Sequence, residues 1–355
     1  DGAYHASFDR SWSVGSYTAL VRDAQSPVEV WEEGIDAAMV SDHSPGVRPN
    51  WMTSEADGFV DDTQATLGLP VRLREDEARE MAAAADAGEP DHARPSAASA
   101  TGVAPWHGFP RGALPGNFLH DQLEWLAGVS FALGRDATLA PVLERRCARA
   151  GWGHRSGDVG QWLQRVCGTP LDALGAGGRG PGVALQALQG TAAELEFWLP
   201  SAGLRAAEVD ALCRRHILPG RERPVLAART LHGMLMGFID LAFEHEGRYG
   251  VLDYKSNALG TTDAAYAPHA LVAALLQHRY DVQAALYQVA LHRLLRARLG
   301  STYAPARHLH GAVVWFLRGL AAPGQGAVWL PPAVDLIEAL DAMLAGHTSA
   351  GGPPA

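Results

Sequence analysis

The pattern of apolar and polar positions separates a weakly patterned first third of the chain from a remainder with clear periodicity. Residues 23–105 are rich in Ala, Asp, Glu, Pro, Ser and Gly and show little periodicity. Such a segment cannot bury enough apolar surface to offset the entropy lost on ordering. We therefore expect 23–105 to be an acidic, flexible linker in which proteases cut within 23–100. We expect 106–346 to be one folded domain and 347–355 to be a disordered tail.

Four segments within the expected domain have the sequence pattern of β-strands. Two apolar runs flank His245-Glu246-Gly247-Arg248, which predicts a β-hairpin. Alternating acidic and apolar residues before the hairpin predict another strand, and a continuous apolar run after it predicts a buried one. The expected strands lie near 191–199, 229–243, 248–255 and 308–317.

Helical periodicity fills most of the remaining domain. A helix is expected over 118–133, with Asn117 as its N-cap, and residues 171–189 look loosely helical. Further helices are expected within 139–167 (two) and over 266–277, 280–299 and 332–345. Strands interspersed with helices predict an α/β fold in which helices cover both faces of a mixed central sheet.

Charge is unevenly distributed along the chain. The formal net charge is −10, but residues 1–105 hold 19 Asp and Glu against 7 Arg, so the acidity lies in the expected linker. Neither part shows the strongly basic stripe of an autonomous DNA-binding domain. We therefore expect weak intrinsic affinity for nucleic acid.

Cysteine content and hydropathy exclude several classes of protein. The three cysteines are widely spaced with no Cys-x-x-Cys, which argues against a disulfide framework and against a zinc or iron–sulfur site. No apolar run reaches 18 residues and no signal peptide is present, so a cytoplasmic protein without a membrane partner is expected. The chain starts at Asp1, which suggests a fragment of a longer protein.

The hairpin carries the strongest chemical signal. Asp240 lies inside the apolar run of the first strand and Asp253 lies near the end of the second. Carboxylates are costly in apolar surroundings unless they are paired or bind a metal ion. Asp253 and Lys255 are two positions apart and project from the same face of their strand. Asp240 and Asp253 can thus share one divalent cation, and the Lys255 ammonium lies close to the same point.

Lys255 is the only lysine in the chain, beside 28 arginines. A composition so strongly biased toward arginine suggests that lysine persists where a compact ammonium with a tunable pKa is needed. The alternative is a chance lysine at the end of a hairpin.

The segments GFIDL (237–241) and LDYKSN (252–257) resemble the catalytic hairpin of the RecB-type nucleases, within the PD-(D/E)xK superfamily. The resemblance covers roughly 106–346, with a short further match at 8–20. It implies a restriction-endonuclease-like mixed central sheet flanked by helices. It also implies that residues 1–22 are the end of a helicase region.

Four further positions match the family's motifs. The resemblance assigns His120 as a metal ligand and Glu194 as an active-site glutamate. It also assigns Gln283 and Tyr287, one helical turn apart, as the Gln-x-x-x-Tyr motif. From the residues alone, His120 could be a structural histidine and Glu194 part of a solvated edge strand. Gln283 and Tyr287 could likewise belong to a generic helix face. We expect both to lie outside the apolar stripe of their helix, so that their replacement would weaken cutting more than folding.

The resemblance implies a Mg²⁺-dependent DNA nuclease domain of a RecB-like subunit of exodeoxyribonuclease V. It would hydrolyse phosphodiester bonds during double-strand break repair by homologous recombination. Asp240, Asp253, the Tyr254 carbonyl and His120 would bind Mg²⁺, a cation that prefers oxygen ligands. Lys255 would orient a metal-bound water, and Glu194 would help to position water or a second ion. No P-loop motif is present, so no ATP hydrolysis by this route is expected.

The resemblance also implies partners. These are DNA strands delivered by a helicase and RecC-like and RecD-like subunits, with RecA as a further candidate. Two other interpretations stay open. The domain could accordingly be a module that docks RecC or loads RecA, with weak or lost catalysis. It could also be an unrelated α/β protein with a chance Asp-x-Lys hairpin.

Overall fold

The computed structural model describes residues 13–15, 20–21, 104–171, 174–175 and 178–346. The expected flexible linker (but for its last two residues) and the expected tail lie outside these residues, as does most of the expected end of a helicase region.

A mixed sheet of six strands forms the centre of the fold. Its strands are β1 (Ser13–Gly15), β4 (Gly190–Arg205), β5 (Thr230–His245), β6 (Arg248–Lys255), β7 (Leu309–Phe316) and β8 (Ala327–Leu330). β5 pairs antiparallel with β4 and β6 and parallel with β1. β7 pairs parallel with β6 and antiparallel with β8. The four expected strands and the mixed character of the sheet are confirmed.

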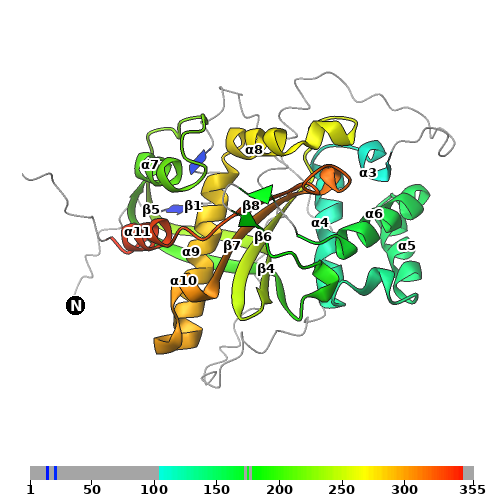
Figure 1. Cartoon of the computed structure of the whole chain (residues 1–355), viewed down its shortest axis with the longest axis horizontal. Coiled ribbons are helices and arrows are strands. Elements are labelled where there is room, and N and C mark those ends of the chain that lie inside the picture. Colours follow the sequence, from blue (N-terminus) through cyan, green and yellow to red (C-terminus); the bar gives the residue numbers. More distant parts are fainter. Residues whose placement is uncertain (1–12, 16–19, 22–103, 172–173, 176–177, 347–355) are drawn as a thin grey trace, which may run out of the picture.

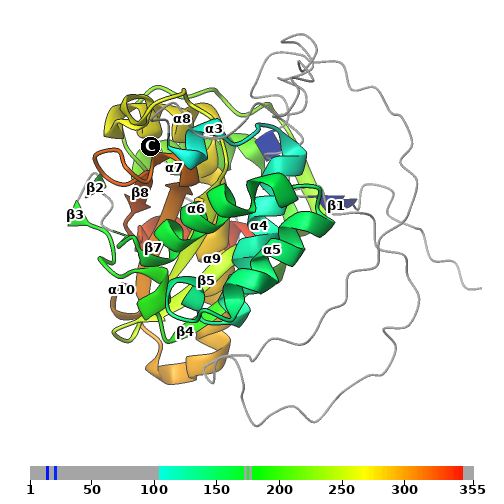
Figure 2. The same ribbon diagram turned by 90° about the vertical axis from the view of Figure 1, so that its right-hand side faces the viewer.

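Helices lie on both sides of this sheet. They are α3 (Pro105–Gly108), α4 (Ala113–Gly128), α5 (Leu139–Arg149), α6 (Ser156–Gly168), α7 (Ala206–His216), α8 (Pro268–Gln277), α9 (Tyr280–Leu299), α10 (Pro305–His308) and α11 (Val334–Leu344). In Figure 1, α9 crosses the sheet beside α7 and α11, while α4, α5 and α6 gather at the other side of the molecule. Figure 2 shows α4, α5 and α6 packed side by side.

Two apolar clusters fill the two sides of the sheet. One contains Leu235, Val251 and Phe316 of the sheet together with residues of α7, α8, α9 and α11. The other contains Leu252 and Trp315 together with residues of α4, α5 and α6. The expected α/β architecture with helices on both faces is therefore confirmed.

The expected helix over 118–133 is shifted toward the N-terminus, and the proposed N-cap at Asn117 is wrong. Helix α4 begins after Gly112, whose φ of 106° only glycine adopts readily. Pro115 fits in the first turn because its missing N–H would have no helical acceptor there. The helix ends before Ser130 and Phe131, which both have positive φ.

The segment 171–189 also differs from its expected loosely helical structure. Its described residues form the short strands β2 (Leu174–Gly175) and β3 (Gly178–Arg179), followed by one 3₁₀ turn. The alanines of this segment favour a helix, but no long helix forms among its described residues, because glycines interrupt the segment and favour turns.

Candidate active site

A tight hairpin turn sets the register of β5 and β6. His245 pairs with Arg248, and the two residues between them, Glu246 and Gly247, have φ of 52° and 74°. Positive φ at both central positions matches the right-handed twist of the flanking strands. The resulting register pairs Leu241 with Leu252. The pairing ends there, and Asp240 and Asp253 are the next residues on the two strands.

Glu194 occupies the corresponding position on the other neighbour of β5. Its flanking residues Ala193 and Leu195 pair with Leu241 and Ile239, so Glu194 lies opposite Asp240. Glu194 interrupts the regular strand with a φ of 47°, in the left-handed region that is uncommon for a residue with a side chain. Three carboxylates thus come from the neighbouring strands β4, β5 and β6. Backbone strain of this kind is concentrated at functional sites.

Asp240 is buried between the hairpin and α4. Its Oδ2 accepts a hydrogen bond of 2.7 Å from the backbone N–H of Tyr254. The Nδ1 atom of His120, on α4, lies 3.5 Å from the same oxygen. The His120 and Tyr254 rings meet edge to face with centroids 5.9 Å apart. The structure therefore brings His120 from a distant helix to Asp240, as the sequence interpretation required.

Lys255 is fully buried at the end of β6. Its Nζ lies 3.0 Å from Asp253 Oδ2 and donates a 3.0 Å hydrogen bond to Gln283 Oε1 on α9. The same nitrogen lies 3.9 Å from the centroid of the Tyr280 ring. A carboxylate, an amide oxygen and an aromatic face all favour the charged ammonium.

Gln283 and Tyr287 continue this contact along α9. Gln283 Nε2 donates a hydrogen bond of 2.8 Å to the Tyr287 hydroxyl. Burial raises the pKa of Tyr287 well above its ordinary value, and the charges of Asp253 and Asp240 raise it further. Lys255 and the Gln283 hydrogen bond act in the opposite direction without reversing the shift. The phenol consequently stays neutral and protonated beside the carboxylates.

The expectation that Gln283 and Tyr287 lie outside the apolar stripe is wrong. Both side chains are buried, because α9 is enclosed on nearly all sides from Tyr280 to His292. A polar pair on such a helix must satisfy its hydrogen bonds within the protein. Gln283 does so through Lys255 and Tyr287.

Two residues of this arrangement were not singled out from the sequence. Tyr280 covers the Lys255 ammonium, and its hydroxyl donates a 3.2 Å hydrogen bond to Asn257 Oδ1. Tyr280 is three positions before Gln283 and so shares its helix face, and Asn257 is two positions after Lys255. Spacing from the motif residues could have indicated both.

Gly237 provides space for an aromatic contact behind the site. It pairs with Phe197 of β4, and a Cβ at Gly237 would lie 2.6 Å from the tip of the Phe197 ring. The Phe197 ring therefore lies across β5 and meets the Tyr287 ring edge to face, with centroids 5.8 Å apart. A glycine beneath an aromatic ring pins the register of a strand pair.

The donor set fits a hard divalent cation. Within the described part of the chain, no three His, Cys, Asp or Glu side chains are already arranged around one point as metal ligands. However, Asp240 and Asp253 supply buried carboxylate oxygens, and the buried His120 Nδ1 makes no hydrogen bond in spite of its distance of 3.5 Å from Asp240. Carboxylates with one imidazole suit Mg²⁺ or Mn²⁺ better than a thiophilic metal.

A family comparison agrees with this geometry. The model of the PD-(D/E)XK nuclease superfamily matches residues 110–335, which include every residue of the site described above. The chain belongs to the PD-(D/E)XK nuclease superfamily, and its expected fold is confirmed.

The curated relatives refine this membership. The chain is 39% identical over 258 residues to the RecBCD enzyme subunit RecB of Escherichia coli, a match covering 68% of the chain and 20% of that protein. It is 37% identical over 187 residues to RecB of Haemophilus influenzae (51% of the chain and 14% of the relative). It is 32% identical over 270 residues to RecB of Mycolicibacterium smegmatis (66% and 24%). The chain thus holds a RecB-like nuclease domain and spans only about a quarter or less of these relatives.

Among the helices that the structure describes, none combines the length and apolar character needed to cross a membrane. The cytoplasmic location expected from the sequence stays a prediction.

Proposed function

We propose that this domain is a Mg²⁺-dependent deoxyribonuclease that hydrolyses phosphodiester bonds of DNA as part of a RecB-like subunit. The observation that carries the proposal is the buried Lys255, 3.0 Å from Asp253 and 3.0 Å from Gln283, on a hairpin that also carries Asp240. A buried ion pair of this kind contributes little net stability compared with apolar residues of similar volume. A catalytic role explains its presence.

The side chains of the site have separate roles in this proposal. Asp240, Asp253, the Tyr254 carbonyl and His120 would hold the cation, and Glu194, opposite Asp240, would position water or a second ion. When bound, a divalent cation lowers the pKa of a coordinated water and offsets negative charge on the phosphate.

Lys255 would orient the attacking water and stabilise the charge that develops on the phosphate oxygens. Gln283 fixes the ammonium by accepting a hydrogen bond from one of its three N–H groups. Tyr287 fixes the Gln283 amide in the orientation that presents Oε1 to the lysine. Because the site contacts the phosphate backbone, we expect cleavage with little dependence on base sequence.

The partners belong to the same proposal. The relatives are named as subunits of the RecBCD enzyme. We infer that this domain works beside RecC-like and RecD-like subunits in exodeoxyribonuclease V, in the repair of DNA breaks by recombination. Single strands would be delivered by a helicase, which fits a sequence that shows no strongly basic stripe. A contact with RecA stays an expectation from the resemblance.

The direct test is cleavage of single-stranded DNA by the purified chain, with Mg²⁺ and with EDTA. Degradation in the presence of Mg²⁺ but not in EDTA supports the proposal. A docking module without catalysis would cut neither with Mg²⁺ nor with Mn²⁺, yet would bind a RecC-like partner.

A further inference from the structure

A buried ionic network lies at the first turn of α9, beside the site but outside it. It joins two aspartates, Asp210 of α7 and Asp281 of α9, to three arginines. Asp281 is fully buried; Arg223 Nη1 donates to it at 2.7 Å, and Arg279 Nε lies 3.1 Å from it. Asp210 lies 2.8 Å from Arg279 Nη2 and 3.0 Å from Arg214 Nε. Removing charges from water is costly, so such a network needs complete pairing.

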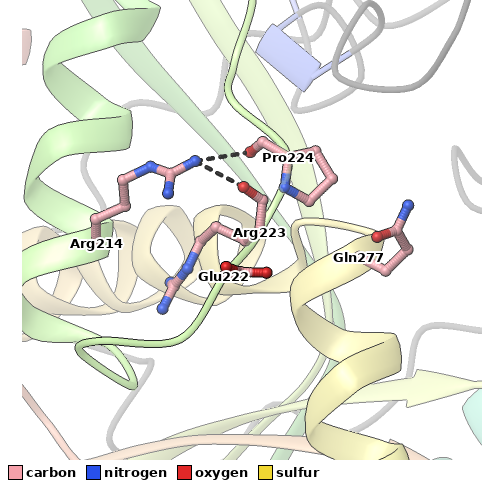
Figure 3. Close-up of a pocket in the computed structure, with 5 residues that line it drawn as sticks. All are labelled: Arg214, Glu222, Arg223, Pro224 and Gln277. Atoms are coloured by element: carbon pink, nitrogen blue, oxygen red, sulfur yellow. Dashed lines mark hydrogen bonds between the residues drawn. The ribbon is translucent and has the colours of Figure 1, made fainter.

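Backbone carbonyls accept further hydrogen bonds from these arginines and tie a loop to the network. Arg223 Nη2 donates to the carbonyls of Ile217 and Leu218, at 2.8 and 2.7 Å. Arg214 Nη2 donates to the carbonyls of Arg223 and Pro224, as Figure 3 shows. Arg279 Nη1 also donates to the Pro224 carbonyl, at 2.7 Å. The start of α9 is thereby attached to α7 and to the loop between α7 and β5.

Arg279 holds a backbone conformation that its own residue type disfavours. It precedes the first residue of α9 with φ 58° and ψ 29°, in the left-handed region. Its side chain is only 1% exposed and is held by both aspartates of the network. A non-glycine residue persists in this region where its surroundings over-determine it. The network therefore fixes the direction in which α9 starts.

The direction of α9 determines where Lys255 can lie. Tyr280, the residue after Arg279, places its ring 3.9 Å from the Lys255 ammonium. Gln283, one turn further, accepts the hydrogen bond from the same ammonium. Both of these contacts of Lys255 thus come from the first turn of the helix that Arg279 starts.

We propose that Arg279, held by Asp281 and Asp210, is a positioning residue that sets the Lys255 ammonium for catalysis. The inference deepens the proposed nuclease function and rests on it for its kinetic consequence. The claim that the network controls the surroundings of Lys255 can be tested without measuring DNA cleavage.

The single lysine of the chain makes this measurement possible. Protein labelled with ¹³C-lysine gives the side-chain signals of Lys255 alone. In the parent chain the Tyr280 ring face should displace the signals of the methylene next to Nζ from their position in free lysine. In Asp281→Asn, which keeps the shape of the side chain but removes its charge, these signals should move toward the free-lysine position. The kcat for single-stranded DNA should fall about ten- to a hundredfold with KM within about threefold, because small misplacements of catalytic groups have effects of this size.

Asp341→Asn is the matched control. Asp341 also pairs with two arginines, Arg293 and Arg296, but these lie in the last turns of α9, far along the helix from Lys255. This variant should leave the lysine signals in place and kcat within about twofold of the parent. This should hold even if its melting temperature falls as far as that of Asp281→Asn. If Asp281→Asn does not fold, Asp210→Asn removes one of the two carboxylates on Arg279 and takes its place in the comparison.

Unchanged lysine signals in the folded Asp281→Asn or Asp210→Asn variant would overturn the inference, as would equal changes in Asp341→Asn. A parent chain that cuts no DNA would refute the proposed function, whereas the lysine signals would still decide whether the network positions Lys255.

Discussion

The ammonium of Lys255 and the amide of Gln283 are joined by a hydrogen bond of 3.0 Å between two buried side chains 28 positions apart. This bond connects the hairpin that carries Asp240 and Asp253 to helix α9. Tyr287, hydrogen-bonded to the other end of the amide, fixes which atom of Gln283 faces the lysine. The central chemical group of the site is therefore positioned from two separate elements.

Substitution of Lys255 by arginine should abolish most of the activity although the charge is kept. The side chain is fully buried against Asp253, Gln283 and the Tyr280 ring, so the larger planar guanidinium cannot occupy the same space. We expect Lys255→Arg to lower kcat by about 10²- to 10³-fold, the usual loss for one donor to a developing oxyanion, and Lys255→Ala at least as much. Cleavage of single-stranded DNA measures this, with circular dichroism as the control for folding. Near-normal cutting by Lys255→Arg would show that the lysine is only a charge on a hairpin.

Removal of the Tyr287 hydroxyl should disturb activity more than folding. Tyr287→Phe keeps the buried ring and its edge-to-face contact with Phe197 but leaves Gln283 without one partner. We expect a loss of roughly 1 kcal/mol in the free energy of unfolding, typical of one hydrogen bond. The kcat should fall several-fold, since the Gln283 amide can then rotate away from Lys255.

Gln283→Ala tests the same contact from the other side. It removes the acceptor of Lys255 and the donor to Tyr287, both buried, and should therefore lower kcat further than Tyr287→Phe. Denaturant unfolding gives the stability change of each variant, and steady-state kinetics gives kcat. If both variants lose stability strongly and retain kcat when folded, the pair serves only the core.

The pH dependence of stability should reveal the ion pairs of Asp341. Burial raises the pKa of this carboxyl, but hydrogen bonds from Arg293 and Arg296 outweigh burial and hold the pKa below its ordinary value. A lowered pKa in the folded state means that the carboxylate stabilises the protein above the unfolded-state pKa, about 3.9, and loses this contribution as the pH falls through the folded-state pKa. Asp341→Asn should therefore be less stable than the parent at pH 7, with the difference shrinking below about pH 4. Unfolding in urea at pH 3 to 7 measures it, and a difference independent of pH would contradict the ion-pair account.

Local signals in the sequence were sufficient for the hairpin and for the placement of Asp253 beside Lys255. Gly247 between two apolar runs predicted the turn, and the two-residue period placed Asp253 and Lys255 on one face. The bounds of α9 were also predictable, since Gly300 ends a long periodic segment. The motif residues His120, Glu194, Gln283 and Tyr287 required the family resemblance, because each is ordinary in its own segment.

Long-range packing could not be predicted in the same way. The burial of Gln283 depends on the sheet and on the neighbouring helices that enclose α9, and none of these is encoded in the helix itself. The left-handed conformations of Glu194 and Arg279 are imposed by strand pairing and by a buried ionic network. The start of α4 was misplaced because Pro115 and Gly116 resemble a turn, although both fit within the first turn of a helix.

The central claim is that the hairpin carboxylates hold a divalent cation for DNA cleavage, and Asp253→Asn tests it most directly. The substitution keeps the size of the side chain but removes the charge that a hard cation requires. The measurement is the rate of single-stranded DNA cleavage by the parent chain and by Asp253→Asn at increasing Mg²⁺, with EDTA as the blank. The account predicts cleavage by the parent that depends on Mg²⁺ and a rate about 10³-fold lower, or none, in a folded Asp253→Asn. Cleavage by Asp253→Asn at the parent rate, or cleavage by the parent in EDTA, would contradict it.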